Sequence, residues 1–307
     1  MKVKTINIIL TRKFDAWVNS IQDEELKNKV LHKTIITGGC ITSMLLNEPV
    51  NDYDMYFTDK ETALSVADYY IKLFKENPPP RFKSGHKVEI YVDSSLEDRI
   101  KIIVKSAGIA SETENKDYRY FETVPMDFTD CTPDEYVEGV MDIIQADTDD
   151  TKPPYRPIFL SSNAITLSDK IQLIIRFFGK PEEIHSNYDF IHCTNYWSSK
   201  DRKLHLNEKA LAATLTKELK YVGSKYPLCS IIRTRKFIQR GWTINAGQYL
   251  KMAMQLNTLD LLSVDVLEDQ LVGVDAAYFV ELIAKLRESN PEKVNETYLA
   301  EILDRMF

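Results

Sequence analysis

The fold of this chain is most constrained by one short stretch, residues 34–57. An apolar segment at residues 35–36 predicts a β-strand, and the glycine pair at residues 38–39 predicts a turn into a short helix. A proline loop then leads into a second predicted strand that begins near Asp52. A strand, a turn, a helix and a returning strand in so few residues predict a unit built on a β-sheet.

Two acidic residues, Asp52 and Asp54, lie at the start of this second strand. Because side chains alternate along a strand, the two carboxylates project from one face about 6 to 7 Å apart, while Tyr53, Met55 and Phe57 project from the other. Like charges at that spacing repel each other, and a divalent cation with oxygen ligands relieves the repulsion. The pair therefore predicts a site for Mg²⁺ or Mn²⁺, with a solvated strand edge as the alternative.

Gly38 and Gly39 add an anion-binding feature beside the acid pair. Glycine lets a phosphate approach the backbone, and the N-terminus of the following helix offers N–H groups and the positive end of the helix dipole. A glycine pair also occurs in ordinary turns. The combination of both features is more specific than either one alone.

The order of these features resembles the nucleotidyltransferase superfamily that includes DNA polymerase β. The nearest resemblance is to the head domain of tRNA nucleotidyltransferases and bacterial poly(A) polymerases, with the motif Gly-Gly-x-Val-Arg-Asp-x-Leu-Leu-Gly-x-x-x-x-Asp-x-Asp. The matching positions here are Gly38, Gly39, Leu45, Leu46, Asp52 and Asp54. Thr42 and Ser43 replace the Arg-Asp pair and Asn47 replaces the third glycine, so the contacts of those family residues are not transferred. Ser43 is kept only as a candidate nucleotide-binding residue.

The resemblance implies an α+β fold in which a mixed sheet is flanked by helices and followed by a C-terminal all-α domain. We expect an N-terminal helical segment at residues 1–34, a catalytic head at residues 35–200 and a helical domain at residues 201–307 that clamps nucleotide and acceptor. The implied reaction transfers a nucleoside monophosphate from an NTP to an acceptor hydroxyl, an RNA 3′ end by family resemblance. Asp52 and Asp54 would hold two Mg²⁺ or Mn²⁺ ions, and the glycine pair would hold the phosphates.

The superfamily reaction also needs a third carboxylate on a strand beside the Asp-x-Asp strand. Residues 187–197 are rich in aromatic and β-branched side chains, which favours a strand there and makes Asp189 the candidate. Glu89 and Asp93 are the next candidates. The alternative is that Asp189 only caps a turn.

Other segments carry weaker signals. Apolar spacing predicts a helix within residues 12–31, and Asp59 can cap a helix that ends before the prolines at residues 78–80. Residues 158–167 and 171–178 read as a hairpin, although the second could also be a helix. Further predictions are strands at 88–92, 100–104 and 118–126, a helix at 133–146, an acidic solvated surface at 127–150, and a helical bundle from residue 246 onward.

Charge is distributed unevenly. The chain carries a formal charge of −7, yet residues 200–240 hold eleven basic and three acidic residues. Such a local excess is typical of a surface that contacts a polyanion, so this segment is the expected RNA contact.

Residues 232–244 also resemble the neck segment of the family, which makes Arg233 and Lys236 candidates for triphosphate contacts, with a solvated basic helix face as the alternative. The base-reading acid and arginine of the family have no counterpart at residues 225–229, so base selectivity is not transferred.

The sequence shows no long apolar run and no signal-peptide pattern at its N-terminus, so we expect a cytoplasmic protein without a membrane span. The four cysteines lack a Cys-x-x-Cys spacing and are expected as thiols. Two alternatives to RNA extension stay open. One is nucleotidyl transfer to a small molecule or a protein, and the other is a catalytically inactive fold that serves as a binding or structural subunit.

Overall fold

The computed structural model describes residues 1–77, 88–106, 153–161 and 163–261, together with residues 263, 266 and 270. The chain divides into two compact units, each described separately below. Among the described residues, the sheet unit comprises 1–77, 88–106, 153–161, 163–185 and 193–207, and the helical unit comprises 186–192 and 208 onward. The predicted strand at 118–126, the helix at 133–146 and the acidic surface at 127–150 lie outside the described residues.

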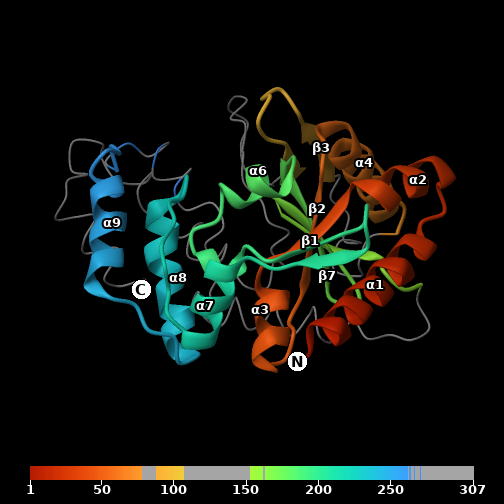
Figure 1. Cartoon of the computed structure of the whole chain (residues 1–307). Helices are drawn as coiled ribbons and strands as arrows, with labels where there is room; N and C mark the ends of the chain where they lie inside the picture. Colours follow the sequence, from red (N-terminus) through yellow and green to blue (C-terminus); the bar gives the residue numbers. More distant parts are fainter. Residues whose placement is uncertain are drawn as a thin grey trace. The chain divides into compact units, whose positions relative to one another are not determined.

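A seven-stranded mixed sheet forms the centre of the sheet unit (Figure 1). Its order is β5-β6-β7-β2-β1-β8-β9, with β2 and β7 parallel and its other neighbouring strands antiparallel. The strands are β1 (Thr34–Thr37), β2 (Tyr53–Phe57), β5 (Pro157–Leu160), β6 (Ala164–Leu167), β7 (Ile171–Phe178), β8 (Tyr196–Ser198) and β9 (Lys203–His205). A mixed sheet with flanking helices confirms the predicted α+β class.

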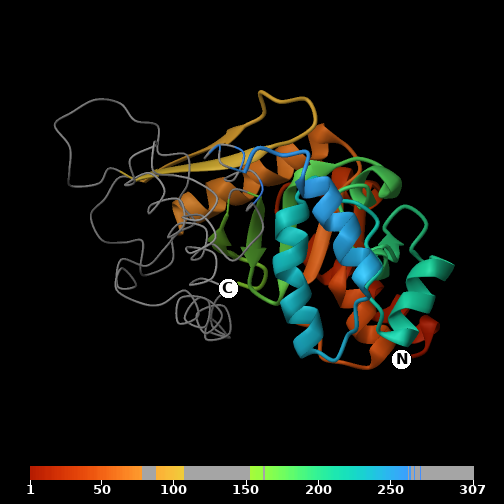
Figure 2. The ribbon, with the colours of Figure 1, turned by 90° about the vertical axis from the view of Figure 1, so that its left-hand side faces the viewer.

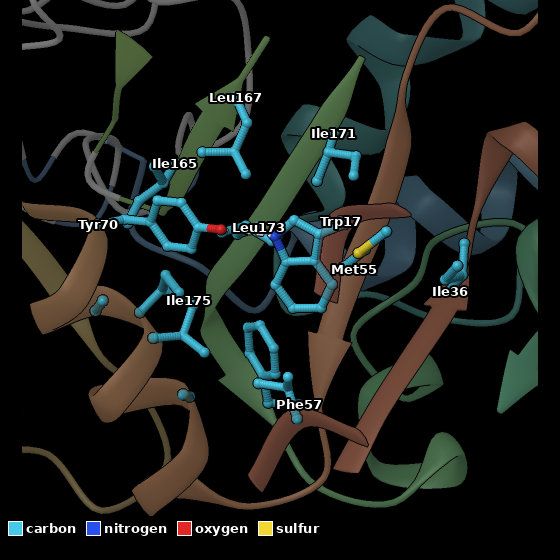
Figure 3. Packing of buried hydrophobic residues seen from close by; sticks show 14 of the residues in the cluster. Trp17, Ile36, Met55, Phe57, Tyr70, Ile165, Leu167, Ile171, Leu173 and Ile175 are labelled. Carbon is cyan, nitrogen blue, oxygen red and sulfur yellow. Dashed lines mark hydrogen bonds between the residues drawn. The ribbon is translucent and has the colours of Figure 1, made fainter. Parts of the chain in front are cut away.

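The hydrophobic core lies on one face of this sheet. Ile36, Met55 and Trp197 stand directly opposite one another on three neighbouring strands, and all three are buried. Trp17 of α1 (Val3–Ser20) packs into the same core and donates its indole N–H to the hydroxyl of Tyr70 at 2.8 Å (Figure 3). Tyr53, Met55 and Phe57 all pack in or against this core, so the face predicted for these three residues is confirmed, while Asp52 precedes β2.

Helices α1 and α2 (Glu24–Lys33) correct the prediction of one helix within residues 12–31. The first helix ends at Ser20, and the side chain of Asp23 accepts hydrogen bonds from the backbone N–H groups of Glu25 and Leu26. A capping aspartate satisfies N–H groups that a continuous helix would pair internally, so it begins a new helix.

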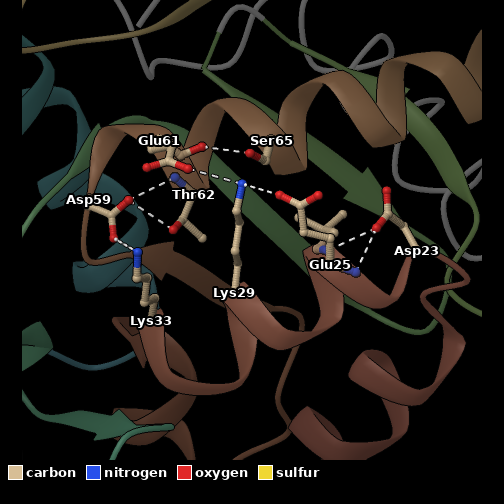
Figure 4. Close-up of polar contacts among 9 residues, drawn as sticks. Asp23, Glu25, Lys29, Lys33, Asp59, Glu61, Thr62 and Ser65 are labelled. Atoms are coloured by element: carbon tan, nitrogen blue, oxygen red, sulfur yellow. Dashed lines mark hydrogen bonds and ion pairs between the residues drawn. The ribbon is translucent and has the colours of Figure 1, made fainter.

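Helix α4 (Lys60–Glu76) begins where the sequence predicts, at a cap formed by Asp59. The Asp59 carboxylate accepts from the backbone N–H of Thr62 at 2.9 Å and pairs with Lys33 of α2 at 3.1 Å. Lys29 lies between Glu25 and Glu61, 3.1 Å from each carboxylate (Figure 4). Exposed pairs of this kind contribute about 0 to 1 kcal/mol each, so they orient α2 on α4 more than they stabilise the fold.

The hairpin interpretation of residues 158–178 is confirmed for β6 and β7, but the predicted first arm, residues 158–167, consists of two antiparallel strands, β5 and β6. Leu167 pairs with Ile171 across a turn in which Asp169 and Lys170 adopt positive φ angles of 64° and 61°. The helical alternative for residues 171–178 is therefore wrong, because these residues form β7. The predicted strands β3 (Val88–Asp93) and β4 (Lys101–Ser106) also form, as a separate two-stranded sheet.

Three helices make up most of the described helical unit: α7 (Glu208–Thr216), α8 (Pro227–Gln239) and α9 (Ala246–Leu256). Helices α8 and α9 lie side by side, as two views show (Figures 1 and 2). Tyr221 joins the unit by donating its backbone N–H to Gln248 at 2.9 Å and its hydroxyl to Gln255 at 2.6 Å. These helices confirm the expected C-terminal helical part, and most of the helical bundle predicted from residue 246 onward lies outside the described residues. Among the described helices, none combines the length and apolarity that a membrane crossing requires.

Candidate functional site

A row of polar side chains crosses the sheet on the face opposite the core. The register places Asp54 of β2 directly opposite Thr37 of β1 and Gln172 of β7, and Thr37 opposite Tyr196 of β8, which in turn faces His205 of β9. Directly opposed residues have Cα atoms about 4.5 to 5.5 Å apart and point to the same face. We call Gln172, Asp54, Thr37, Tyr196 and His205 the polar row.

Asp54 lies within β2, on the face opposite the core, and Asp52 is the residue that precedes the first residue of β2, Tyr53; the helix after the glycine pair is α3 (Gly39–Leu46). The side chain of Asp52 keeps an exposed surface, but the protein around it raises the pKa of its carboxyl by desolvation, against the opposing effects of its own backbone N–H and of Lys170. Burial raises the pKa of the Cys40 thiol, and the charges of Asp54 and Asp52 raise it further. Both carboxylates therefore act on the residue that follows the glycine pair.

The two glycines of the turn differ in what the protein requires of them. Gly38 has a φ of 91° and donates its N–H to the carbonyl of Cys193 at 3.2 Å. Backbone in this region is accessible to glycine and strained for other residues. Gly39 begins α3, is exposed, and a Cβ built on it would meet nothing within 4 Å. The backbone explains the glycine at position 38, whereas the space beside Gly39 is open to a ligand.

Thr37, the residue before the turn, is fully buried and surrounded by polar groups. Its hydroxyl donates to the carbonyls of Asn195 at 2.9 Å and Cys193 at 3.2 Å, and Nε2 of His185 lies 2.9 Å from the same oxygen. A hydroxyl has one hydrogen and two lone pairs, so we assign the proton of the histidine to Nε2, which donates to Thr37. Burial lowers the pKa of His185 to about 4, so its ring is neutral at pH 7.

The prediction that residues 187–197 form a strand beside the acid pair is wrong. Ile191–Cys193 form a 3-10 helix, and β8 begins only at Tyr196. The neighbours of β2 in the sheet are β1 and β7, and β7 places Gln172 opposite Asp54 instead of a carboxylate. Asp189 precedes the 3-10 helix in the helical unit, where its carboxylate accepts from the guanidinium of Arg233 at 2.9 Å.

The other candidate residues are spread over several elements. Arg233 and Lys236 both lie on α8, the first paired with Asp189 and the second exposed. Ser43 lies within α3 and is buried. Glu89 and Asp93, the reserve carboxylates, lie on β3 of the two-stranded sheet. Any contact of Ser43, Arg233 or Lys236 with a nucleotide stays a prediction.

The donor set is chemically suited to Mg²⁺ bound together with a phosphorylated substrate. Within the described ranges, no group of three or more His, Cys, Asp or Glu side chains could hold a metal ion on its own. Proteins commonly bind Mg²⁺ through one or two carboxylates while substrate phosphates and water complete its six ligands. The desolvated carboxyl of Asp52, beside that of Asp54, fits this arrangement because a cation would offset the cost of its charged form.

His185 and Thr37 are site residues that the sequence did not reveal. They are separated by 148 positions in the chain, and no local pattern links a histidine at the end of the short helix α6 (Pro181–His185) to a strand so far away. The only available signal was the place of Thr37 directly before the glycine pair.

Several solved structures are similar to this chain at low identity. The Thermotoga maritima CCA-adding enzyme complexed with tRNA is 11% identical, with 94% of this chain and 53% of that chain covered and a TM-score of 0.36. The Bacillus stearothermophilus CCA-adding enzyme in complex with CTP is 12% identical, with 87% and 51% covered and a TM-score of 0.35. The chain thus spans about half the length of these two enzymes.

A curated relative is similar to part of this chain. It is "Gabija anti-defense 2" of Bacillus phage SPbetaL7, 24% identical over 139 residues, which are 45% of this chain and 33% of that relative. The chain therefore matches a third of the length of this relative. The model of the family described as "Gabija anti-defense 2 family protein" matches residues 9–217, which are more than half of the chain. The chain belongs to the Gabija anti-defense 2 family.

Proposed function

We propose that this protein is a metal-dependent nucleotidyltransferase, which transfers a nucleoside monophosphate from an NTP to an acceptor hydroxyl and releases pyrophosphate. The observation that carries the proposal is the register of β1 and β2. Asp54 lies directly opposite Thr37, and Thr37 immediately precedes Gly38 and Gly39. An acid pair and a glycine turn at this separation fit the two ends of one bound triphosphate.

The proposed roles follow from the chemistry of each group. Asp52 and Asp54 would hold two Mg²⁺ or Mn²⁺ ions, which would supply charge stabilisation for the transferred phosphoryl group and lower the pKa of the attacking hydroxyl. Gly39 and the first turn of α3 receive the β and γ phosphates, because helix N-termini favour anions. The acceptor hydroxyl gives its proton to the proposed third carboxylate, Asp189, while its oxygen forms a bond to the α-phosphorus and the bond from that phosphorus to the leaving pyrophosphate oxygen breaks.

The helical unit supplies the remaining proposed contacts. Arg233 and Lys236 are proposed to contact the triphosphate, and Asp189 is the proposed third carboxylate. The ion pair between Arg233 and Asp189 makes this assignment conditional, since a carboxylate that binds a metal must give up part of its pairing with the guanidinium. Ser43 is the weakest of the proposed nucleotide contacts because it is buried within α3.

Two acceptor classes are supported by different observations. The basic segment 200–240 supports an RNA 3′ end as the acceptor, since it contains eleven basic residues and only three acidic ones. Membership of a family named for acting against the Gabija defence supports a hydroxyl on a component of that defence, because a transferred nucleotide would add charge and bulk to it. Because NTPs are abundant in the cytoplasm, we place either reaction there.

The test is an incorporation assay with the purified full chain. Each α-³²P-labelled NTP is supplied in turn with Mg²⁺ or Mn²⁺, together with cellular RNA, with purified Gabija proteins, or with no acceptor. Sensitivity of the labelled product to ribonuclease or to protease identifies the acceptor class. We expect label transfer that requires metal and disappears in Asp54→Asn.

A binding or structural subunit gives a different result in the same assay. It binds NTP in the presence of Mg²⁺ but releases no pyrophosphate with any acceptor. That result, with protein of confirmed fold, would reject the enzymatic proposal and retain the site.

A further inference from the structure

We propose that His185 is a positioning residue of the nucleotide site, which holds Thr37 and, through it, the Gly38–Gly39 turn in the geometry that receives the NTP phosphates. The inference rests on the proposed function for the identity of the ligand. It adds a residue on α6 to a site otherwise built from β1, α3 and β2.

The polar row places His185 on the acid-bearing face of the sheet. Thr37 stands between Asp54 and Tyr196 in the register, and the imidazole reaches the hydroxyl of Thr37 with Nε2 at 2.9 Å. The same ring lies 5.7 Å from the ring of Tyr196, centroid to centroid. The histidine therefore contacts the residue that directly faces Asp54, and it does so from the same side of the sheet.

One backbone carbonyl links this histidine pair to the glycine turn. The carbonyl of Cys193 accepts both the hydroxyl of Thr37 at 3.2 Å and the backbone N–H of Gly38 at 3.2 Å. The N–H of His185 occupies a lone pair of the Thr37 oxygen, so the single hydroxyl hydrogen remains directed at the carbonyls of Asn195 and Cys193. Without the histidine donor, one lone pair of the buried Thr37 oxygen loses its hydrogen-bond partner. A different rotamer of Thr37 then becomes more favourable.

The neutral state of His185 suits this position. Burial is the main cause of its low pKa, with the charge of Glu182 acting weakly in the opposite direction. A neutral ring donates to Thr37 without adding a positive charge close to a site for divalent cations. The hydrogen bond is therefore independent of pH across the neutral range.

The test compares variants that keep or remove the donor. His185→Leu removes it, His185→Gln keeps an amide N–H close to the position of Nε2, and Thr37→Val removes the acceptor at nearly constant shape. His32→Gln is the matched control, because His32 is exposed in the last turn of α2 and is not part of the polar row. Binding of Mg²⁺-NTP is measured by calorimetry, and KM and kcat are measured by incorporation.

We expect His185→Leu and Thr37→Val each to weaken NTP binding and raise KM about tenfold, as the loss of one buried hydrogen bond predicts. The double variant should be no weaker than Thr37→Val alone, because Thr37→Val already removes the hydrogen bond to His185 along with the bonds to the carbonyls of Asn195 and Cys193. His185→Gln should recover most of the affinity, kcat should change less than about threefold in each variant, and His32→Gln should match the wild type.

Three results would overturn the inference: unchanged affinity in His185→Leu, additive losses in the double variant, or a fall in kcat at constant KM with no recovery in His185→Gln. Circular dichroism and thermal unfolding establish that each variant is folded before it is measured. Failure of the proposed function is recognised separately, since the wild-type protein would then transfer no label to any acceptor, whatever its affinity for Mg²⁺-NTP.

Discussion

The guanidinium of Arg233 donates to the carboxylate of Asp189 at 2.9 Å, and the carboxylate is the more buried partner, with 11% of its side chain exposed against 39% for the arginine. Both residues belong to the helical unit. We expect Asp189→Asn to lower the free energy of unfolding by about 1 to 3 kcal/mol, because it weakens a charge-assisted hydrogen bond to a partly buried cation. Urea denaturation followed by circular dichroism measures this loss.

Turnover separates the two roles of Asp189. If Asp189 is the third carboxylate of the reaction, Asp189→Asn loses activity even when it is fully folded, without urea and well below its Tm. Arg233→Gln, which breaks the same pair from the other side, is the matched comparison. If both variants lose stability equally and Asp189→Asn keeps full turnover, the residue is structural and the third-carboxylate assignment is wrong.

Asp52→Asn and Asp54→Asn should each abolish nucleotide incorporation without unfolding the protein. The pKa of Asp52 is raised by desolvation, so the folded state binds its proton more tightly than the unfolded chain does. Such a group destabilises the fold as pH rises past its unfolded pKa, and a neutral side chain removes that cost. We therefore expect Asp52→Asn to match or exceed the wild-type Tm at pH 7, and both variants to reduce turnover at least about 100-fold.

The effect of Mg²⁺ on Tm tests independently whether the acid pair binds metal. A ligand that binds only the folded state raises its stability, so Mg²⁺ with NTP should raise the Tm of the wild type and not that of Asp54→Asn. An equal shift in both proteins would place the metal elsewhere.

The two glycines should respond differently to alanine. Gly38→Ala forces a Cβ onto a residue with φ 91° and should cost about 1 to 3 kcal/mol of stability. At Gly39 a Cβ meets nothing within 4 Å, so Gly39→Ala should leave the Tm unchanged or slightly higher. If phosphate approaches the backbone here, Gly39→Ala nevertheless raises the KM for NTP. An unchanged KM would remove Gly39 from the phosphate site.

The central unit was predictable because its signals are local. The strand, glycine turn, helix and acidic strand of residues 34–57 carry their own periodicity and turn residues, and Asp59 carries its own capping signal. Asp169 and Lys170 adopt positive φ angles, which a right-handed helix does not contain, so the chain turns back after residue 167 and forms a hairpin. Each of these elements depends on neighbours within a few residues.

Other features depend on distant parts of the chain and could not be predicted. The segment around Asp189 has strand-like composition, but its neighbours Phe190 and Ile191 bond to Tyr221 and Lys220 instead of extending the large sheet. Tertiary contacts of this kind override local propensity. The polar row has the same origin, since only the register of β1, β2 and β8 brings Asp54, Thr37 and Tyr196 to one face.

The buried His192 should make stability depend on pH below neutrality. Its ring lies 4.3 Å from Trp242 and 4.8 Å from Phe237, centroid to centroid, and burial lowers its pKa from 6.5 to about 4, with Asp189 acting in the raising direction and Arg240 in the lowering one. The unfolded chain therefore binds a proton between pH 6.5 and 4 that the folded chain does not, so stability is full above this window and falls as pH drops through it. The loss attributable to this histidine is at most about 3 kcal/mol.

His192→Gln has no such proton to bind, so its Tm should fall less steeply as the pH is lowered than that of the wild type. Because the comparison uses slopes, a lower absolute Tm in the variant does not affect it, and parallel slopes would show that His192 does not set the acid sensitivity.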